Sequence, residues 1–363
     1  MVRGTSKSES QAMTKGVVFF SRCRPQGSDT VDLVLRELRV FIGYPAWRKN
    51  VMPRRGHLRE SVIDFQCSDE DWAPLYASFG DERREYQKNR NFIRSVKPEA
   101  IALVPRPNRG VVYAGRVVVP FEVLDDPPWG DDYLRLRHAQ GLDVEDEFSH
   151  LADVAQCCEV DRFRSISLLL IPAWIRRSLF GRSTYGLVTP IAALDLDGFV
   201  TLDRLLENPR FAERAWTDDV TEVERRLVDA IGPNAFEHLC VALLQLEYLE
   251  HVWVHVGGSG DGGVDGIGSD ANGRVVGLLQ CKWTYYGEDV AISAPDTQGS
   301  VRQVLAALIH PVNVRPLKGI EFWSRSAVAS RVVQHADRLP LAMSLRIKHS
   351  ASVNHPSLLA RDP

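Results

Sequence analysis

The length and composition of the chain indicate a globular protein with room for two domains. It has 363 residues, of which 44% are hydrophobic and 25% are charged, a balance typical of folded proteins. The formal net charge of −3 excludes a chain that is basic throughout, so binding to nucleic acid would have to come from local basic clusters and bound cations.

The six cysteines show no C-x-x-C pair and no histidine spacing typical of zinc. We expect them to be reduced and mostly buried, as in a cytoplasmic protein. The most apolar run, Leu168–Ile171, ends at Pro172 and is far shorter than the ~20 apolar residues of a membrane span. Residues 1–15 lack the apolar centre of a secretion signal, and we expect residues 1–28 to form a disordered tail.

Residues 29–193 have the pattern of a mainly β module with a few helices. Short β-rich runs at 38–42, 100–104 and 115–119 are separated by proline and glycine, which is typical of strands joined by turns. We expect this module to close into a small barrel.

Basic and aromatic residues of this module are candidates for contact with nucleic acid. Lys88, Arg90 and Arg94 lie in one basic segment that we expect to face phosphates. Aromatic residues near predicted loops offer surfaces on which an extruded base can stack. These are Trp47, Trp72, Tyr86, Trp129 and Tyr133. Aromatic residues of a barrel also belong to its core, and the sequence does not choose among them.

A change of pattern near residue 218 predicts a second domain. Residues 194–217 have mixed polarity, and we expect a linker with one short helix. Within 218–348 we expect helices at 234–244, 301–308 and 327–336 and strands at 251–256, 274–283, 319–323 and 343–347. We expect a mixed sheet flanked by helices, followed by a polar tail at 349–363.

The stretch Gly257–Gly266 permits two interpretations. Residues 258–263 satisfy G-x-G-x-x-G, a dinucleotide-binding pattern that requires a strand before it and a helix after it. The strand at 251–256 fits, but residues 264–273 are rich in Gly, Asp and Asn, which disfavour a helix. Asn272-Gly273 instead predicts a two-residue hairpin turn. The lack of a predicted helix after the glycines therefore argues against a nicotinamide-dependent oxidoreductase.

The predicted hairpin brings three polar side chains together. A two-residue turn places Asp265 directly opposite Gln280, and Lys282 shares the face of Gln280. A bulge or a longer turn would shift this register by one residue and turn one set to the other face. Asp265 and Gln280 supply the oxygen ligands that Mg²⁺ prefers, and Lys282 is suited to orient water or stabilise negative charge. The three suit metal-assisted phosphodiester hydrolysis.

Glu237 has two competing interpretations. It lies beside apolar positions of the predicted helix at 234–244, where an unpaired carboxylate is costly and a metal would relieve the cost. The spacing from Asn234 to Glu237 also resembles a capping box at a helix start. We expect Asp261 to be a turn residue. His238, His251 and His255 lack a fourth ligand with the spacing of zinc.

These residues resemble a family. Phe236-Glu237, the glycine-rich run Gly260–Gly266 and Gln280-Cys281-Lys282 look like the Mrr-type branch of the PD-(D/E)xK nuclease superfamily. The resemblance covers about 218–347 and implies Mg²⁺ (or Mn²⁺) held by Asp265, Gln280 and Glu237, with Lys282 taking part in cleavage of double-stranded DNA. Gln280 stands where the wider superfamily has glutamate, which lowers the charge of the ligand set.

The front module is similar to EVE domains of the PUA-like fold. The residues that carry the similarity are Tyr86–Arg94 and Gly110–Val117, and it implies a reader of modified bases. The fold class expected is thus α/β and α+β, a PUA-like barrel followed by a PD-(D/E)xK nuclease domain. The function implied is a modification-dependent, type IV-like restriction endonuclease that acts in defence against foreign modified DNA. We expect a cytoplasmic protein and a possible homodimer. The alternative is a reader of modified nucleic acid that does not cut.

Overall fold

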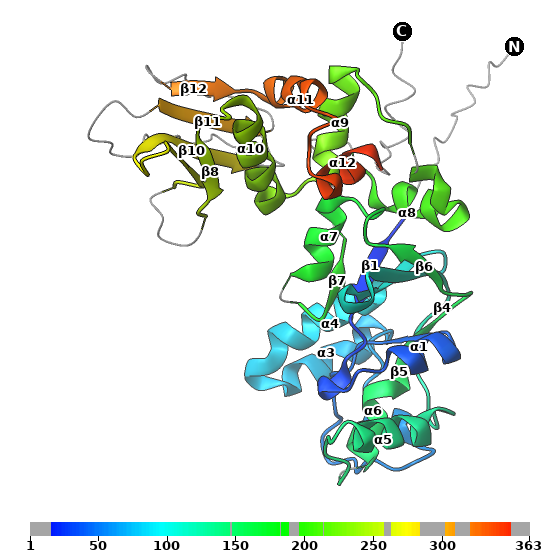
Figure 1. Cartoon of the computed structure of the whole chain (residues 1–363). Helices are drawn as coiled ribbons and strands as arrows, with labels where there is room; N and C mark the ends of the chain where they lie inside the picture. The colour runs from blue at the N-terminus through cyan, green and yellow to red at the C-terminus, as the bar shows by residue number, and fades with distance from the viewer. Residues whose placement is uncertain are drawn as a thin grey trace, which may run out of the picture.

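The computed structural model describes residues 16–145, 147–181, 183–188, 196–212, 214–257, 263–283, 302–308 and 320–349. Figure 1 shows two groups of strands, one in residues 16–188 (the front part) and one in residues 196–349 (the rear part). None of the described helices is long and apolar enough to cross a membrane. All six cysteines are free, and Cys67 alone among them is not buried.

The front part contains short strands with helices between them. Its strands are β1 (Val18–Ser21), β2 (Arg39–Phe41), β3 (Ile101–Arg106), β4 (Val111–Val123), β5 (Gln156–Val160), β6 (Arg164–Ser167) and β7 (Tyr185–Leu187). Its helices are α1 (Val31–Glu37), α2 (Leu58–Ser61), α3 (Asp69–Ser78), α4 (Arg83–Ser95), α5 (Gly130–Ala139), α6 (Glu147–Ala155) and α7 (Ala173–Phe180).

The front sheet is mixed and open. Its strands follow the order β2-β5-β4-β3-β1-β7, with β6 paired to β4, and β1 runs parallel to β3 whereas the other pairs are antiparallel. The outermost strands β2 and β7 do not pair with each other among the described residues. The expected closure into a barrel is therefore not present in the described part of the chain.

The rear part places a sheet beside a group of helices. Its elements are α8 (Gly198–Glu207), α9 (Val220–Ala230), α10 (Pro233–Glu247), β8 (Val252–His255), β9 (Gly266–Ser269), β10 (Val275–Trp283), β11 (Arg302–Leu308), β12 (Ile320–Trp323), α11 (Arg325–Gln334) and α12 (Leu341–Lys348). The sheet order is β12-β11-β10-β9-β8. The meander β8-β9-β10 is antiparallel, and β11 and β12 continue parallel to β10. The predicted mixed sheet flanked by helices is confirmed.

Helix α10 packs on the rear sheet through the predicted apolar stripe. Phe236, Leu239, Cys240 and Leu243 are fully buried and share a core with Leu279 of β10. The ring of Phe236 lies 5.4 Å from that of Trp283, measured between centroids. Leu279, Cys281 and Trp283 therefore face α10, and the alternation along a strand turns Gln280 and Lys282 to the opposite face.

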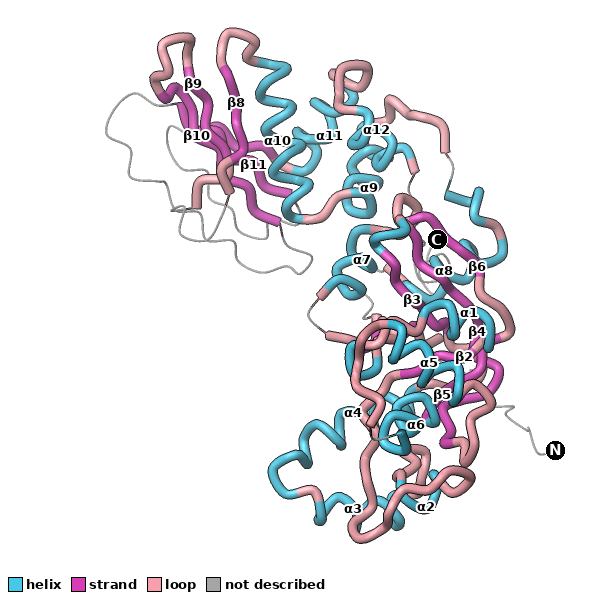
Figure 2. The backbone as a smooth tube through the Cα atoms, turned by 60° about the horizontal axis from the view of Figure 1, so that its bottom comes forward, coloured by secondary structure: helices cyan, strands magenta, loops and turns pink. Residues whose placement is uncertain are grey.

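One hydrophobic core joins the two parts. Ile101 and Leu103 of β3 belong to the cluster that contains the rear core, whereas Ala102 and Val104, on the other face of the same strand, belong to a second cluster in the front part. Helix α8 lies between the parts and contributes Leu202 and Leu205, both fully buried, to the joint cluster. Figure 2 shows α7 and α8 at this junction. The helix expected in 194–217 is present, but it is packed into the core.

The structure corrects three sequence-based expectations. Residues 302–308 form strand β11 rather than a helix, because they pair with β10 on one side and β12 on the other. Residues 343–347 lie inside helix α12 rather than a strand; Pro340 precedes its first residue, and α12 packs on α9. The expected tail at 1–28 includes β1, whose four residues are all buried.

The joint core predicts that α8 stabilises the whole molecule. Leu202→Ala removes a fully buried side chain, so we expect it to lower the free energy of unfolding by about 2–5 kcal/mol. The matched control is Leu341→Ala, which truncates a leucine that is 71% exposed on α12 and should change stability by less than about 0.5 kcal/mol. Chemical denaturation measures both, and equal effects would contradict the joint core.

Candidate nuclease site

The turn between β9 and β10 is one residue longer than predicted. The Asp270 N–H donates to the Arg274 carbonyl at 2.9 Å, and the Gly273 N–H donates to the Asp270 carbonyl at 2.9 Å. The loop thus contains three residues, 271–273, and Gly273 adopts the left-handed conformation at φ +75° that such turns require. The Asp270 carboxylate also accepts from the Asn272 and Arg274 amides, at 2.8 and 2.9 Å.

A bulge restores the register that the sequence predicts. Ser269 pairs with Val275, one residue away from the predicted partner, but the pairing shifts between Val275 and Gly277. Gly277, Leu278 and Leu279 then pair with Gly268, Ile267 and Gly266, as the two-residue turn predicted. Two departures from the ideal hairpin thus cancel before the pairing reaches Asp265.

Asp265 lies against β10 at the level of Gln280. Its N–H donates to the Leu279 carbonyl at 2.8 Å, and its carboxylate accepts from the Cys281 N–H at 2.6 Å. These two contacts flank Gln280. The hairpin therefore brings Asp265 to the segment of β10 that carries Gln280 and Lys282.

Gln280 is buried in a way that suits an oxygen ligand. Gln280 is only 5% exposed, and its Oε1 has no hydrogen-bond partner within the described residues. A buried, unsatisfied amide oxygen is costly, and a bound cation would relieve that cost. Gly263 lies against this side chain, because a Cβ at Gly263 would come 2.5 Å from the Gln280 Nε2. Lys282, two residues further along, is half-buried.

Glu237 does not cap its helix. Helix α10 begins at Pro233 with Gly232 as its N-cap, and no side chain caps it, so the capping-box interpretation is wrong. The Glu237 carboxylate instead contacts the His255 Nε2 at 2.7 Å. The His238 ring packs on His255 with 4.1 Å between centroids. Glu237 therefore lies at the end of β8, where the Val256 N–H donates to the Asp265 carbonyl at 3.1 Å.

Burial and the charges of the Asp265 and Glu237 carboxylates raise the pKa of Cys281. Burial raises the pKa of the Cys281 thiol well above its usual range, and the contact with Cys240 and the charges of Asp265 and Glu237 raise it further. Cys281 is consequently a neutral, buried thiol near both carboxylates. Its role is packing, which leaves the polar chemistry to its neighbours Gln280 and Lys282.

The described residues contain no cluster of three or more His, Cys, Asp and Glu side chains that could hold a metal ion. His251 lies 3.8 Å from the Glu250 carboxylate, away from the His238–His255 pair. Asp261, expected to be a turn residue, lies outside the described residues. A strand, β9, follows the glycine-rich stretch, so the helix that a dinucleotide site requires does not begin there.

Trp72, Trp129 and Tyr133, three of the five aromatic candidates of the front part, belong to the core. Trp72 and Trp129 are 5% and 4% exposed. The Trp72 Nε1 donates to Gln87 at 2.8 Å, and the Trp129 Nε1 donates to the Val154 carbonyl at 3.2 Å. Tyr133 is fully buried.

Trp47 and Tyr86 are placed differently. Both are half-buried, and both line one cavity of about 430 Å³. The structure thus separates the aromatic candidates into core residues and cavity residues, a distinction that the sequence did not provide.

The three basic candidates also differ. Arg90 is 3% exposed, donates to the Cys67 carbonyl and to Asp69, both at 2.8 Å, and lies over the Trp72 ring. Arg94 contacts the same carboxylate. Lys88 is exposed, with Glu85 3.8 Å away. Arg90 stabilises the fold, and Lys88 is the candidate that faces solvent.

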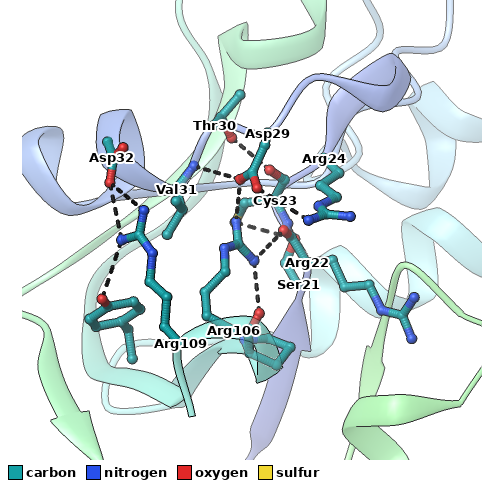
Figure 3. A network of polar contacts seen from close by, with 12 residues as sticks. Ser21, Arg22, Cys23, Arg24, Asp29, Thr30, Val31, Asp32, Arg106 and Arg109 are labelled. Carbon is teal, nitrogen blue, oxygen red and sulfur yellow. Dashed lines mark hydrogen bonds and ion pairs between the residues drawn. The ribbon is translucent and has the colours of Figure 1, made fainter. Parts of the chain in front are cut away.

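An arginine cluster that the sequence analysis missed lines another cavity, of about 500 Å³. Arg22, Arg24 and Arg106 contribute to its walls, with the exposed Phe180 of α7. Arg106 is buried, with its guanidinium held by Asp29 at 2.9 Å and by the Arg22 carbonyl at 2.9 Å (Figure 3). Its Nε has no hydrogen-bond partner within the described residues. No sequence signal marks this cluster, because only the pairing of β1 with β3 brings these arginines together.

Comparison with known proteins finds one family match, in the rear part. Residues 228–310 match the family model Mrr_cat, described as a restriction endonuclease. The matched segment contains Glu237, Asp265, Gln280 and Lys282, and the match suggests a restriction endonuclease whose substrate is DNA. No curated protein and no solved structure matches the chain significantly.

The packing of Gly263 on Gln280 predicts a measurable difference between two glycines. Gly263 and Gly273 both have positive φ, +81° and +75°, so alanine costs each about 1–2 kcal/mol of backbone strain. A Cβ at Gly273 meets nothing within 4 Å. We expect Gly263→Ala to lower the free energy of unfolding by up to ~1 kcal/mol more than Gly273→Ala, because the end of the buried Gln280 side chain must move, measured by denaturation. Gln280→Ala should remove this excess, and an excess that persists would place the clash elsewhere.

Proposed function

We propose that the protein is a Mg²⁺-dependent endonuclease that cuts DNA carrying modified bases, as a restriction enzyme directed against foreign DNA. The observation that carries the proposal is the agreement of two findings. The family match spans residues 228–310, and within this segment the hairpin brings Asp265 to the level of Gln280, two residues before Lys282.

Asp265 and Gln280 are the proposed metal ligands, with Mn²⁺ as the substitute ion. A bound Mg²⁺ would stabilise the developing charge of the phosphate and lower the pKa of water. The Asp265 carboxylate is oriented by the Cys281 N–H, which leaves further lone pairs for an ion. Gln280 contributes a neutral oxygen, so the metal keeps more of its charge for the phosphate.

Lys282 and Glu237 complete the proposed site. Lys282 shares a strand face with Gln280 and provides an ammonium group that can hold the attacking water or offset charge on the phosphate. We assign Glu237 to the same metal, reached past the end of β8, because α10 lies on the face of β10 opposite to Gln280 and Lys282. In the described structure His255 holds the Glu237 carboxylate at the end of β8, next to the backbone that carries Asp265.

The front part is the proposed reader of the modified base. Lys88 and the arginine cluster of Arg22, Arg24 and Arg106 are its proposed contacts to DNA phosphates, and Trp47 and Tyr86 are its proposed contacts to the base. The resemblance of residues 86–94 and 110–117 to EVE domains supports this assignment. The alternative function, a reader that does not cut, shares the front part and differs in whether the rear site hydrolyses DNA. We infer a cytoplasmic location from the free cysteines, and we propose a homodimer as a possible assembly.

Cleavage of plasmid DNA tests the proposal directly. With Mg²⁺, methylated plasmid should be cut and unmodified plasmid should stay intact, and chelation of the metal should stop cutting. Lys282→Ala should lower the cleavage rate by at least about 100-fold while DNA binding stays within about twofold. Lys348→Ala, which removes a half-buried lysine from α12, is the matched control. Intact methylated plasmid despite tight binding would favour the non-cutting reader.

The neutral ligand at Gln280 predicts a metal-dependent phenotype. Gln280→Glu adds a charge to the ligand set, so we expect Mg²⁺ to bind about tenfold more tightly, measured by calorimetry without DNA. Gln334→Glu adds the same charge at an exposed position of α11 and should leave Mg²⁺ binding unchanged. Unchanged or weaker binding in Gln280→Glu would remove this residue from the metal site, whatever the cleavage assay shows.

A further inference from the structure

The cavity that contains Trp47 and Tyr86 has aromatic walls and a polar floor. Its volume is about 430 Å³, which suits a single planar heterocycle with room for a substituent. Three rings, those of Tyr44, Trp47 and Tyr86, line it together with Gln26, Arg137 and Asp153. These residues come from the segment after β1, the segment after β2, and helices α4, α5 and α6.

Two of the rings are held in place by the surrounding fold. Trp47 forms an antiparallel bridge with Val62, flanked by hydrogen bonds from the Arg48 N–H to the Ser61 carbonyl at 2.7 Å and from the Ile63 N–H to the Ala46 carbonyl at 2.8 Å. Tyr86 packs on Phe79 with 4.3 Å between ring centroids. Rings fixed in advance lose little entropy when a ligand stacks on them.

Two residues of the lining have strained backbones. Tyr44 and Gln26 have φ of +63° and +46°, in the left-handed region that costs a residue with a side chain about 1–2 kcal/mol. Both line this one cavity. Backbone strain of this kind is concentrated at active sites and ligand-binding sites, where the surrounding structure maintains it.

The floor is a buried hydrogen-bonded network around Asp153. Asp153 is 2% exposed, and its carboxyl contacts the Tyr133 hydroxyl at 3.2 Å. The Arg137 Nη1 donates to the same hydroxyl at 3.3 Å, and the rest of its guanidinium is held by the Asp143 carbonyl at 2.8 and 3.0 Å. The His150 Nδ1 lies 4.0 Å from Asp153.

Asp153 keeps its proton up to a higher pH than an exposed carboxyl does. Burial raises its pKa to about 7, against the opposing effects of the Tyr133 hydrogen bond, the Arg137 charge and a hydrogen bond from Gln26, so the neutral form predominates below pH 7. A neutral carboxyl group presents one donor beside one acceptor, whereas an ionised one presents acceptors alone.

The arginine cluster begins two residues away along the chain. Gln26 lines this cavity, whereas Arg22 and Arg24, in the same segment, line the arginine cavity. Figure 3 shows Arg22, Arg24 and Arg106 gathered around this segment. The backbones of Arg24 and Gln26 are at most about 7 Å apart, so one segment carries both a candidate phosphate contact and part of the cavity lining. This proximity favours a nucleotide of DNA over a free heterocycle.

We propose that this cavity binds an extruded nucleobase of DNA that carries an amino group beside a ring-nitrogen acceptor, as cytosine and adenine do, and that Asp153 pairs with this edge. The inference rests on the proposed function and specifies the base that its front part reads. The Asp153 hydroxyl donates to the ring nitrogen, and its carbonyl oxygen accepts from the amino group. Tyr44, Trp47 and Tyr86 enclose the two faces of the base.

The pairing makes base preference depend on pH. Cytosine and adenine need the protonated carboxyl, so their binding is strongest below pH 7 and weakens by up to about tenfold per pH unit above it. Guanine and thymine present a ring N–H, which an ionised carboxylate also accepts. Their binding should not weaken as the pH rises, and the two classes of base are thereby distinguished.

A binding assay tests the inference separately from cleavage. The full chain with Lys282→Ala, without Mg²⁺, is titrated with duplexes of one sequence that differ at one central position. The probes carry cytosine, 5-methylcytosine, adenine, N6-methyladenine, guanine or thymine there, and a flanking 2-aminopurine reports extrusion by its fluorescence. At pH 6.5 we expect the probe with 5-methylcytosine or the one with N6-methyladenine to bind about tenfold more tightly than the guanine and thymine probes.

The variant Asp153→Asn distinguishes the contribution of Asp153 to the pH dependence from that of the groups around it. Asparagine keeps a donor beside an acceptor at every pH, so this variant should bind the preferred probe with equal affinity from pH 6 to 8.5. Tyr133 and Arg137 of α5, His150 of α6, Tyr86 of α4 and Tyr44 face the same site and are all retained in this variant. A pH dependence that persists in Asp153→Asn would overturn the assignment of the pairing to Asp153.

Variants of the walls test the cavity itself. Trp47→Leu and Tyr86→Leu should each weaken binding of the preferred probe by about 5- to 100-fold and lower the 2-aminopurine signal. The matched control is Tyr76→Leu, because Tyr76 lines a neighbouring cavity with Lys88 and Phe92. Methylated plasmid cut equally well by all three variants would overturn the inference and leave the endonuclease standing. Base-selective binding without cutting would contradict the proposed endonuclease and leave the inference standing.

Discussion

The site depends on the register between β9 and β10. A strand pair that slipped by one residue would turn Asp265 away from Gln280 and break the link between the carboxylate and the Cys281 amide. Three features hold the register: the three-residue turn closed by Asp270, the bulge between Val275 and Gly277, and the packing of Leu279 and Cys281 on α10. Strand β9, Gly-Ile-Gly-Ser, has few side chains of its own to specify pairing, so the helix contributes much of the specificity.

The register that brings Asp265 to Gln280 could be predicted from the sequence, although two errors in the prediction cancelled each other. Asn272-Gly273 marked the turn correctly, but its length was wrong by one residue, and the bulge reversed the error. Local patterns identify a turn because its residues need particular φ values. They do not reveal a bulge, whose cause is the fit of β10 against its neighbours. The contact of Glu237 with His255 was likewise invisible, because it joins a helix to a strand that packs on it.

The same limit explains where the fold differed from expectation. Residues 302–308, Arg-Gln-Val-Leu-Ala-Ala-Leu, have good helix propensity, yet they form a strand between β10 and β12, as tertiary pairing overrides local preference. Aromatic residues gave no local signal of their roles. Trp72 and Trp129 satisfy their indole N–H groups inside the core, whereas Trp47 lines a cavity. That distinction depends on residues far away in the chain.

The joint core has a consequence for how reading and cutting combine. Strand β3 serves the front core with one face and the rear core with the other, and α8 fills the junction with fully buried leucines. Separating the parts would expose this apolar surface, so the described parts move as one body unless that cost is met. If the proposed function holds, a base at Asp153 and a phosphate near Asp265 lie at a fixed offset. The position of the cut relative to the modified base is then set by the core, and shortening a side chain of α8 would loosen it without touching either proposed site.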